Sequence, residues 1–300
     1  MDDLEVRQLR YFVAVAEELH FGRAARRLGM AQPPLSRAIR DLERTLGVRL
    51  LDRTTRHVAL TAAGEVLLRE GRSALEAVTA AARRTRHAGR PAPVLRLALK
   101  ADFDAGLLPR MIAAYQREQG LPPVELVLGG RGDQVAALRD GRADVALLPG
   151  PYDDTDVDAE PLVTEPRVVA LAAGDPLVDR PELHLADFAG RTLPDGTPAE
   201  QDGAGRPARV GPRPRDLAEI FNMVELGDMV WFLPTSLARR HPRPGIAYRP
   251  VCDLPLFTLS VAWPRNSRSQ AVAAFVRAAT EVADTHPAAA NASSVATVTS

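Results

Sequence analysis

The sequence contains one cysteine, Cys252, in 300 residues. A single thiol cannot form a disulfide within the chain, and it excludes metal sites built from paired cysteines. Lys100 is the only lysine among the 38 basic residues, and the others are arginines. No apolar run approaches the roughly eighteen residues of a membrane-spanning helix, and the acidic start lacks the basic and apolar segments of a secretory signal. We therefore expect a cytoplasmic protein that binds no membrane.

The chain carries no net charge, but its charges are unevenly distributed. Residues 1–90 hold 17 arginines against 11 acidic residues, whereas residues 91–300 hold 21 basic and 27 acidic residues. Apolar residues make up 46% and charged residues 25%, which is ordinary globular composition and excludes general disorder. A basic amino-terminal part on an acidic body predicts a polyanion-binding module joined to a larger domain with another role.

Residues 1–90 have the apolar spacing that helices require. A first stripe recurs at intervals of three and four and consists of Val6, Leu9, Val13 and Ala16. A short helix is predicted at residues 22–28, and Gly29 can end it because glycine tolerates a left-handed backbone. Pro33 and Pro34 are tolerated in a first helical turn, whose N–H groups have no partners within the helix. A further helix is therefore predicted to begin near Pro33 and to bury Leu35, Ile39, Leu42 and Leu46.

Two short helices joined by a tight turn predict a helix-turn-helix, in which the second helix enters the major groove of DNA. The side chains expected at bases and phosphates are those at its start, namely Gln32, Pro33, Pro34, Ser36 and Arg37. Glutamine suits the edge of adenine, and arginine suits guanine or phosphate. Short extended runs at 48–51 and 57–60 predict a wing, from which Arg53 and Arg56 would reach phosphates or the minor groove. On charge alone, a plain helical bundle with solvated arginines is equally compatible.

A long helix is predicted from Thr61, which can cap its start, to about residue 87. Its small and apolar residues alternate spacings of four and three, and such a heptad pattern predicts a seam that pairs with another helix. The dimer contact is expected to involve Leu68, Gly71, Leu75 and Val78. Residues 89–93, rich in glycine and proline, predict a linker.

The rest of the chain alternates strand-like and helix-like segments, which predicts parallel sheets. Strands are expected at residues 94–99, 124–128, 144–148, 167–172, 229–233 and 256–263. Helices are expected at residues 106–119, 133–139, 216–226, 235–240 and 270–283. Residues 194–214 predict a loop, and the Ala/Ser/Thr-rich residues 286–300 predict a disordered tail.

Residues 7–64 resemble the winged helix-turn-helix of LysR-type transcriptional regulators. The matching stretches are LRYFVAVAE from Leu9, AARRL from Ala24, AQPPLSR from Ala31, LLDR from Leu50 and LTAAG from Leu60. The resemblance is weaker in the body, at residues 106–110, 141–144 and 232–234, which are similar to the family's effector domain.

The resemblance implies a multidomain protein of the α+β and α/β classes, in which a long linker helix joins a winged helix-turn-helix to a periplasmic-binding-protein-like effector domain of two α/β subdomains. The implied parts are residues 1–64 for DNA binding, 65–93 for the linker, 94–285 for the effector domain and 286–300 for the tail. The implied subdomains are residues 94–163 with 264–285, and residues 164–263. The family's DNA contacts carry over to Gln32, Pro33, Pro34, Ser36, Arg37 and Arg53.

The resemblance also implies a regulator that binds operator DNA as a dimer or tetramer and responds to a small molecule in the cleft between the subdomains. The implied partners are double-stranded DNA, further copies of the chain, a small-molecule effector and RNA polymerase, with no cofactor. The alternatives are a constitutive DNA binder with a non-functional cleft, and a small-molecule-binding or enzymatic α/β protein with a structural helical front.

The expected effector positions depart from those of relatives that bind aromatic-pathway acids, where small hydroxyl residues follow the first two strands. The positions here are Lys100, Ala101, Asp102 and Arg131, with Pro149 at the crossover and Thr197 from the second subdomain. Lys100 and Arg131 would supply cationic donors. Alternatively, Asp102 and Asp104 cap a helix, Lys100 pairs with one of the two, and Thr197 belongs to an ordinary turn with Asp195.

Other patterns indicate neither an enzyme nor a metal site. The six histidines include no H-x-x-x-H pair, and no G-x-S-x-G is present. Residues 129–132 lack the Gly-Lys-Ser/Thr ending of a phosphate-binding loop. Cys252 is expected to be buried as a small apolar residue, and Phe221, Trp231 and Phe257 are expected in the core.

Overall fold

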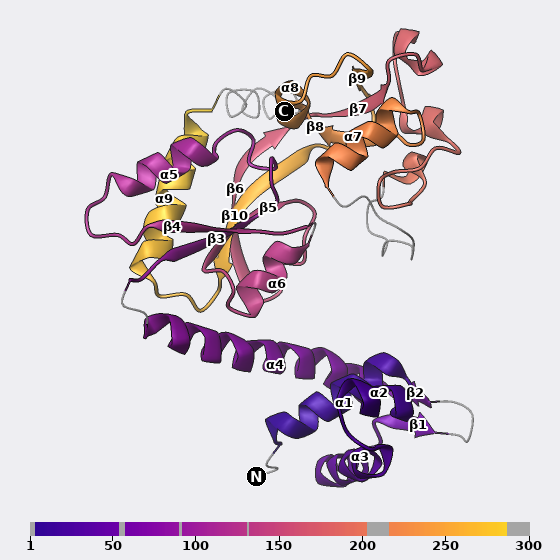
Figure 1. The fold of residues 1–300 in the computed structure, drawn as a ribbon, viewed down its shortest axis with the longest axis vertical. Coiled ribbons are helices and arrows are strands. Elements are labelled where there is room, and N and C mark those ends of the chain that lie inside the picture. Colours follow the sequence, from indigo (N-terminus) through magenta and orange to yellow (C-terminus); the bar gives the residue numbers. More distant parts are fainter. Residues whose placement is uncertain (1–3, 54–57, 90–91, 131, 203–215, 287–300) are drawn as a thin grey trace, which may run out of the picture. The chain divides into compact units, whose positions relative to one another are not determined.

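The computed structural model describes residues 4–53, 58–89, 92–130, 132–202 and 216–286 (Figure 1). Two compact units are present, residues 1–91 with 139–142 and residues 92–138 with 143–300. Arg56 and Arg131, which were predicted to contact DNA and effector, lie outside the described residues, as does the predicted tail from residue 287 onward.

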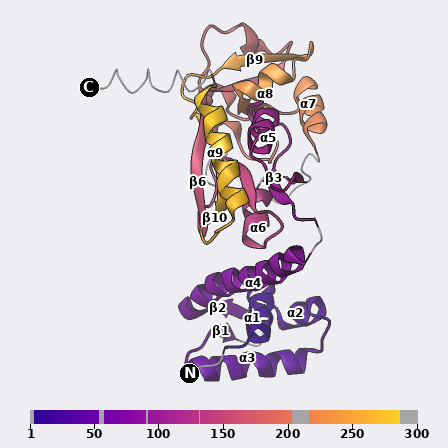
Figure 2. The same cartoon turned by 90° about the vertical axis from the view of Figure 1, so that its left-hand side faces the viewer.

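The first unit is a helical domain with a small two-stranded wing (Figure 2). Its elements are α1 (Val6–Glu18), α2 (Phe21–Arg27), α3 (Gln32–Leu46), β1 (Leu51–Arg53), β2 (Val58–Leu60) and α4 (Ala62–Ala88). The imidazole Nδ1 of His20 begins α2 by accepting hydrogen bonds from the backbone N–H groups of Gly22 and Arg23, at 3.0 and 3.2 Å. Gly47 ends α3 with a positive φ of 69°, which favours glycine.

The apolar stripes of these helices form one core. Its fully buried members include Phe12, Leu35, Ile39, Leu42, Leu50 and Leu51. The predicted burial of Leu35, Ile39 and Leu42 is thus confirmed and fixes the orientation of α3, whereas Leu46 at the end of the helix is only partly buried. Glu17 joins three helices at the edge of this core, since its carboxylate pairs with Arg27 of α2 at 2.7 Å and Arg72 of α4 at 2.8 Å.

The helix α4 approaches α1 of the same chain. A Cβ atom added to Gly71 would lie 3.4 Å from side-chain carbons of Leu9 and Val13, and Leu68 and Leu75 pack against the same core. These three residues were predicted to pair with another copy. They contact their own domain, but Leu68 and Leu75 are only partly buried, so their pairing with another copy stays a prediction. Val78 remains 44% exposed. Within the described ranges, no helix combines the length and apolar character needed to cross a bilayer.

The wing and α4 meet at Gly64. A Cβ atom at Gly64 would lie 2.1 Å from the carbonyl oxygen of Leu50, so only glycine fits without a backbone shift. Thr61 caps α4 by accepting a hydrogen bond from the Gly64 N–H at 3.0 Å, and its hydroxyl donates to the carbonyl of Arg49 at 2.8 Å. The threonine therefore ties the start of α4 to the chain entering the wing.

The second unit contains a five-stranded sheet of order β4-β3-β5-β10-β6. The strands are β3 (Leu95–Leu99), β4 (Val124–Leu128), β5 (Val145–Pro149), β6 (Val157–Glu165) and β10 (Phe257–Pro264). The parallel pairing of β3 with β4 and β5 agrees with the strand–helix alternation, whereas β10 is antiparallel to β5 and β6. The helices α5 (Leu108–Gln116) and α9 (Gln270–Asp284) pack together on one face and α6 (Asp133–Arg139) packs on the other (Figure 2).

A second, three-stranded sheet has the order β8-β7-β9 and is antiparallel throughout. Its strands are β7 (Arg167–Ala172), β8 (Trp231–Pro234) and β9 (Ile246–Pro250), packed against α7 (Leu217–Glu225) and α8 (Thr235–Arg240). Its other face packs against the short helices η1 (Pro176–Asp179), η2 (Leu185–Phe188) and η3 (Ala199–Gln201). Helices therefore cover both faces of each sheet.

Several features of this unit differ from the sequence predictions. The second sheet is antiparallel where parallel pairing was predicted, and its strand β9 was not predicted. The strand β10 lies in the first sheet, so residues 257–263 belong there and not to the second subdomain. The strand β6 was not predicted because Pro161 interrupts its pattern; it lies at the sheet edge, with an irregular register near Pro161, where a missing N–H is tolerated. Cys252 was expected to be buried but is exposed.

Candidate nucleic-acid interface and effector cleft

The start of α3 presents polar side chains to solvent. Gln32, Pro33 and Arg37 are exposed, and Pro34 and Ser36 are partly exposed, whereas Leu35 between them is fully buried. Helical spacing produces this division, since Leu35, Ile39 and Leu42 hold one side of α3 in the core. All five residues predicted at the helix start therefore lie on or near one accessible surface.

Arg37 and Arg53 differ in how their guanidinium groups are used. Within the described part of the chain, Arg37 has no acidic partner. Arg53 donates from Nη2 to Glu43 Oε2 at 2.8 Å and lies over the Phe21 ring, 4.9 Å from its centre. Only 25% of the Arg53 side chain is exposed. Arg37 is thus available to a polyanion, whereas Arg53 also holds the wing to α3.

The charge of Glu17 is stabilised where α1, α2 and α4 meet. Partial burial opposes ionisation, but hydrogen bonds from Arg27 and Arg72 outweigh it and hold the pKa of Glu17 below its ordinary value. The ionised carboxylate therefore helps to hold α1, α2 and α4 together.

In the second unit, a cleft of about 400 Å³ lies between residues of the two sheets. Its lining consists of Lys100, Phe103, Pro149, Gly150, Pro151, Arg167, Asp202, Trp231, Phe232, Pro234, Pro255, Leu256, Phe257 and Thr258. Lys100 follows β3 and Pro149 ends β5, so both lie at the carboxyl ends of parallel strands, where α/β sheets commonly bind ligands. The lining is mostly aromatic, aliphatic and proline surface, as in small-molecule sites.

Phe103 connects the aromatic residues of the cleft. Its ring centre lies 6.4 Å from that of Trp231 and 6.3 Å from that of Phe257. The ammonium group of Lys100 lies 4.0 Å from the centre of the Phe103 ring, which is cation–π geometry. A cation is therefore held at an aromatic wall.

A second cation, Arg167, enters the cleft from β7. It forms an ion pair with Asp202, with distances of 2.7 and 2.9 Å between their nitrogens and oxygens. Only 18% of the Arg167 side chain and 7% of that of Asp202 are exposed. The pair supplies both hydrogen-bond donors and acceptors to the cleft, and its net charge is zero.

Three residues expected at the effector site do not line the cleft. Ala101 and Asp102 belong to the turn after β3, and Asp102 pairs with Arg240 of α8 at 3.0 Å. Asp104 accepts hydrogen bonds from Gly106 and Leu108 at the start of α5, as the capping alternative proposed.

Thr197 is 5% exposed, and its hydroxyl donates to Asp195 at 2.6 Å, which supports the ordinary-turn alternative. Polar groups in the turn after β3 and in the turn that holds Thr197 are satisfied by these local contacts, which explains why the predicted residues do not line the cleft. Lys100 and Pro149 are the predicted positions that the structure places in the cleft.

Sequence reasoning missed several lining residues. Trp231 and Phe257 were assigned to the core, and they are indeed 8% and 7% exposed, yet each also contributes a ring to the cleft. Arg167 lies at the start of a predicted strand, and no pattern distinguishes it from other surface arginines. Its pairing with Asp202 joins residues far apart in the sequence.

Two family models together match nearly the whole chain. The model described as "Bacterial regulatory helix-turn-helix protein, lysR family" matches residues 6–65, and the "LysR substrate binding domain" matches residues 88–284. The chain belongs to the LysR family of transcriptional regulators. This LysR-type regulator therefore carries a DNA-binding domain and an effector-binding domain, as the motifs predicted.

Full-length relatives agree with this assignment. The chain is 32% identical to the Hca operon transcriptional activator HcaR of Escherichia coli, over 91% of this chain and 96% of HcaR. It is 33% identical to the regulator IlvR of Caulobacter vibrioides, over 93% and 98% of the two chains. These relatives are regulators, which supports the prediction that this LysR-type protein is not an enzyme.

Solved structures show the same fold. CbnR, a LysR family transcriptional regulator, has a TM-score of 0.55 and 26% identity over 93% of this chain and 99% of CbnR. Full-length CbnR in complex with its target DNA has a TM-score of 0.53 and 26% identity, covering 93% and 100% of the chains.

Proposed function

We propose that this LysR-type regulator binds operator DNA as a dimer or tetramer and changes its DNA complex when a small molecule occupies the cleft. The main support is the start of α3, where Arg37 lacks an acidic partner within the described residues and the neighbouring polar side chains are accessible. The CbnR structure with its target DNA adds support, because the two proteins share one fold over most of their length.

At the DNA, Gln32 would both accept a hydrogen bond from adenine and donate one to it. Arg37 would donate hydrogen bonds to guanine or to a phosphate. Pro33 and Pro34 present apolar surface to a thymine methyl. Arg37 and the arginines around it would release counterions from the phosphates, which makes affinity fall with salt. Electrophoretic shifts with promoter fragments at several salt concentrations test this proposal: a specific complex that weakens with salt is expected, and no complex at low salt would refute it.

The effector is proposed to be a small organic anion with a flat apolar part. The ammonium of Lys100 would bind the anionic group, and the rings of Phe103, Trp231 and Phe257 would pack against the apolar part. Thermal-shift measurements with carboxylic acids and their matched carboxamides test whether the effector is an anion. Acids should stabilise the protein more than amides, since ligand binding to the folded state raises its stability.

The pairing of Arg167 with Asp202 favours the alternative of a constitutive DNA binder, because a cation neutralised by the protein is less available to a ligand. The same screen separates the two functions. If no compound stabilises the protein and none changes its DNA complex, the constitutive function is preferred.

Pairing of α4 with another copy remains part of the proposal. Val66 and Val78 on α4 are 49% and 44% exposed, so they offer apolar surface that the helix-turn-helix core does not use. Contact with RNA polymerase is the proposed route from this assembly to transcription. Analytical ultracentrifugation of Val78→Glu should show a smaller assembly than the parent if the valines lie in the contact.

A further inference from the structure

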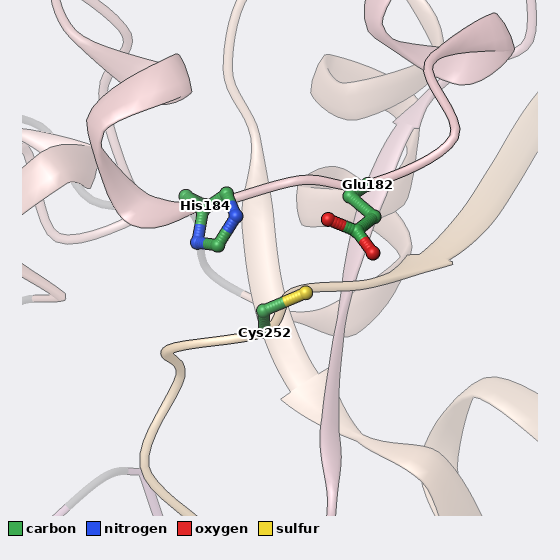
Figure 3. Close-up of side chains that lie close together, drawn as sticks. All are labelled: Glu182, His184 and Cys252. Carbon is green, nitrogen blue, oxygen red and sulfur yellow. The ribbon is translucent and has the colours of Figure 1, made fainter.

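Three side chains of different chemistry converge in the second unit, away from the cleft. The carboxylate of Glu182, the imidazole of His184 and the thiol of Cys252 each offer one donor atom, and these atoms lie within 4.8 Å of one another. Figure 3 shows the three groups directed toward a common space between two chain segments. All three residues are exposed, so an ion from solvent can reach them.

The backbone holds these side chains in place. The N–H of Cys252 donates to the carbonyl of Leu183 at 2.8 Å, which joins the two segments at the centre of the cluster. Leu183 is 1% exposed and belongs to the core under the second sheet, together with Val251 and Leu254. Because Leu183 points into the core, Glu182 and His184 on either side of it are left on the outer surface beside Cys252.

Further hydrogen bonds fix His184. Its backbone N–H donates to Asp187 Oδ2 at 2.8 Å, and Asp253 accepts from the next N–H, that of Leu185, at 2.8 Å. The other oxygen of Asp253 lies 3.9 Å from His184 Nδ1. These hydrogen bonds hold the backbone on both sides of the His184 carbonyl in place beside Cys252.

We propose that Glu182, His184 and Cys252 bind a divalent metal ion of the zinc class. Thiolate and imidazole donors favour zinc over magnesium or calcium, which prefer oxygen ligands. Two ligands of one zinc ion lie roughly 3.3–3.8 Å apart when each is about 2.0–2.3 Å from the metal. The donor atoms now lie within 4.8 Å of one another, so binding would require these exposed side chains to rotate closer together, and water would complete the tetrahedral coordination.

The sequence predicted no metal site, because the expected motifs place ligands close together along the chain. Here Cys252 lies 70 positions after Glu182, and the fold brings them together. The segment holding Cys252 continues directly into Pro255 and Leu256, which line the cleft. A metal ion would therefore fasten a segment that leads into the ligand site.

Cobalt(II) is a suitable probe, because a thiolate bound to cobalt gives an ultraviolet charge-transfer band and Cys252 is the only cysteine. The reduced full-length protein is titrated with cobalt, and zinc is then added to displace it. The parent should show the band, zinc should abolish it, and Cys252→Ser should lack it. Glu182→Gln and His184→Gln should each weaken cobalt binding about tenfold or more, because even the loss of a residue that only supports a metal ligand costs about 10–100-fold in affinity.

Glu160→Gln is the matched control, since Glu160 is exposed on β6 of the other sheet. It should bind cobalt like the parent, and unchanged melting temperatures without metal would show that every variant is folded. Absence of the band in the parent would overturn the proposal. Parental affinity in either Glu182→Gln or His184→Gln would also overturn the three-ligand site.

Discussion

Glu43 and Arg53 form an ion pair at 2.8 Å that joins α3 to the first strand of the wing. The other carboxylate oxygen of Glu43 accepts from the backbone N–H groups of Leu50 and Leu51, at 3.0 and 3.2 Å. One side chain thus fixes the chain between α3 and β1. Arg53 was predicted as a DNA contact from its position, and the structure adds a role inside the protein.

Replacing Glu43 with alanine should destabilise the helix-turn-helix by about 1–3 kcal/mol, because two partly buried N–H groups lose their acceptor. Urea unfolding measures the change. Asp41→Ala is the control, since Asp41 pairs with Arg44 on an exposed surface, and its effect should stay within about 0.5 kcal/mol. Equal stability of the Glu43→Ala variant and the parent would contradict the role of this carboxylate.

Arg37→Ala should weaken operator binding by about 1–3 kcal/mol if the guanidinium contacts a base, while leaving unfolding unchanged because Arg37 is exposed. Arg53→Ala should lower both DNA affinity and stability, since it also breaks the pair with Glu43. Shift assays and urea unfolding on both variants separate the two roles. A stability loss in Arg37→Ala equal to that in Arg53→Ala would show that the distinction is wrong.

Gln32→Ala should relax base preference at one position of each half-site, because glutamine contacts the edge of a base rather than the phosphates. Binding to a set of operators with single substitutions measures this preference. Gln32 is exposed at the start of α3, so folding should be unaffected. An unchanged preference at every operator position would remove Gln32 from the interface.

Gly64→Ala and Gly71→Ala should have different effects although both glycines are buried in α4. A Cβ at residue 64 would meet the Leu50 carbonyl at 2.1 Å, whereas one at residue 71 would make ordinary contacts at 3.4 Å. The first substitution should cost about 1–3 kcal/mol by overpacking. The second should be neutral or stabilise by up to about 1 kcal/mol through helix propensity. Thermal unfolding of the two variants tests the order of stability.

The contribution of Glu17 should depend on pH. Its pKa is lowered in the folded protein from an ordinary 4.5, so the stability it adds is present above pH 4.5 and is lost as the pH falls through the folded-state pKa. Glu17→Gln should therefore be less stable than the parent at pH 7, and the difference should shrink below pH 4.5. A difference that does not vary over this range would contradict the pairing with Arg27 and Arg72.

Much of this fold follows from local sequence patterns. The breaks at Gly29 and Gly47 and the proline pair define α2 and α3, and several helices of the second unit follow their apolar spacing closely. The pairing partners of β10 and the antiparallel second sheet were not predicted, because strand order depends on contacts between distant segments. Lys100 was predicted in the cleft because its position depends only on the end of a nearby strand. The Arg167–Asp202 pair was not predicted, because it depends on a contact between distant segments.

The central claim is that the exposed start of α3 recognises DNA, and selection of chromosomal fragments by the purified full-length protein tests it most directly. The parent should retain promoter fragments at low ionic strength and release them as salt rises, and Arg37→Ala should retain them poorly under the same conditions. If the parent retains no fragment at low ionic strength, or if Arg37→Ala retains the same fragments equally well, α3 does not read DNA in this way.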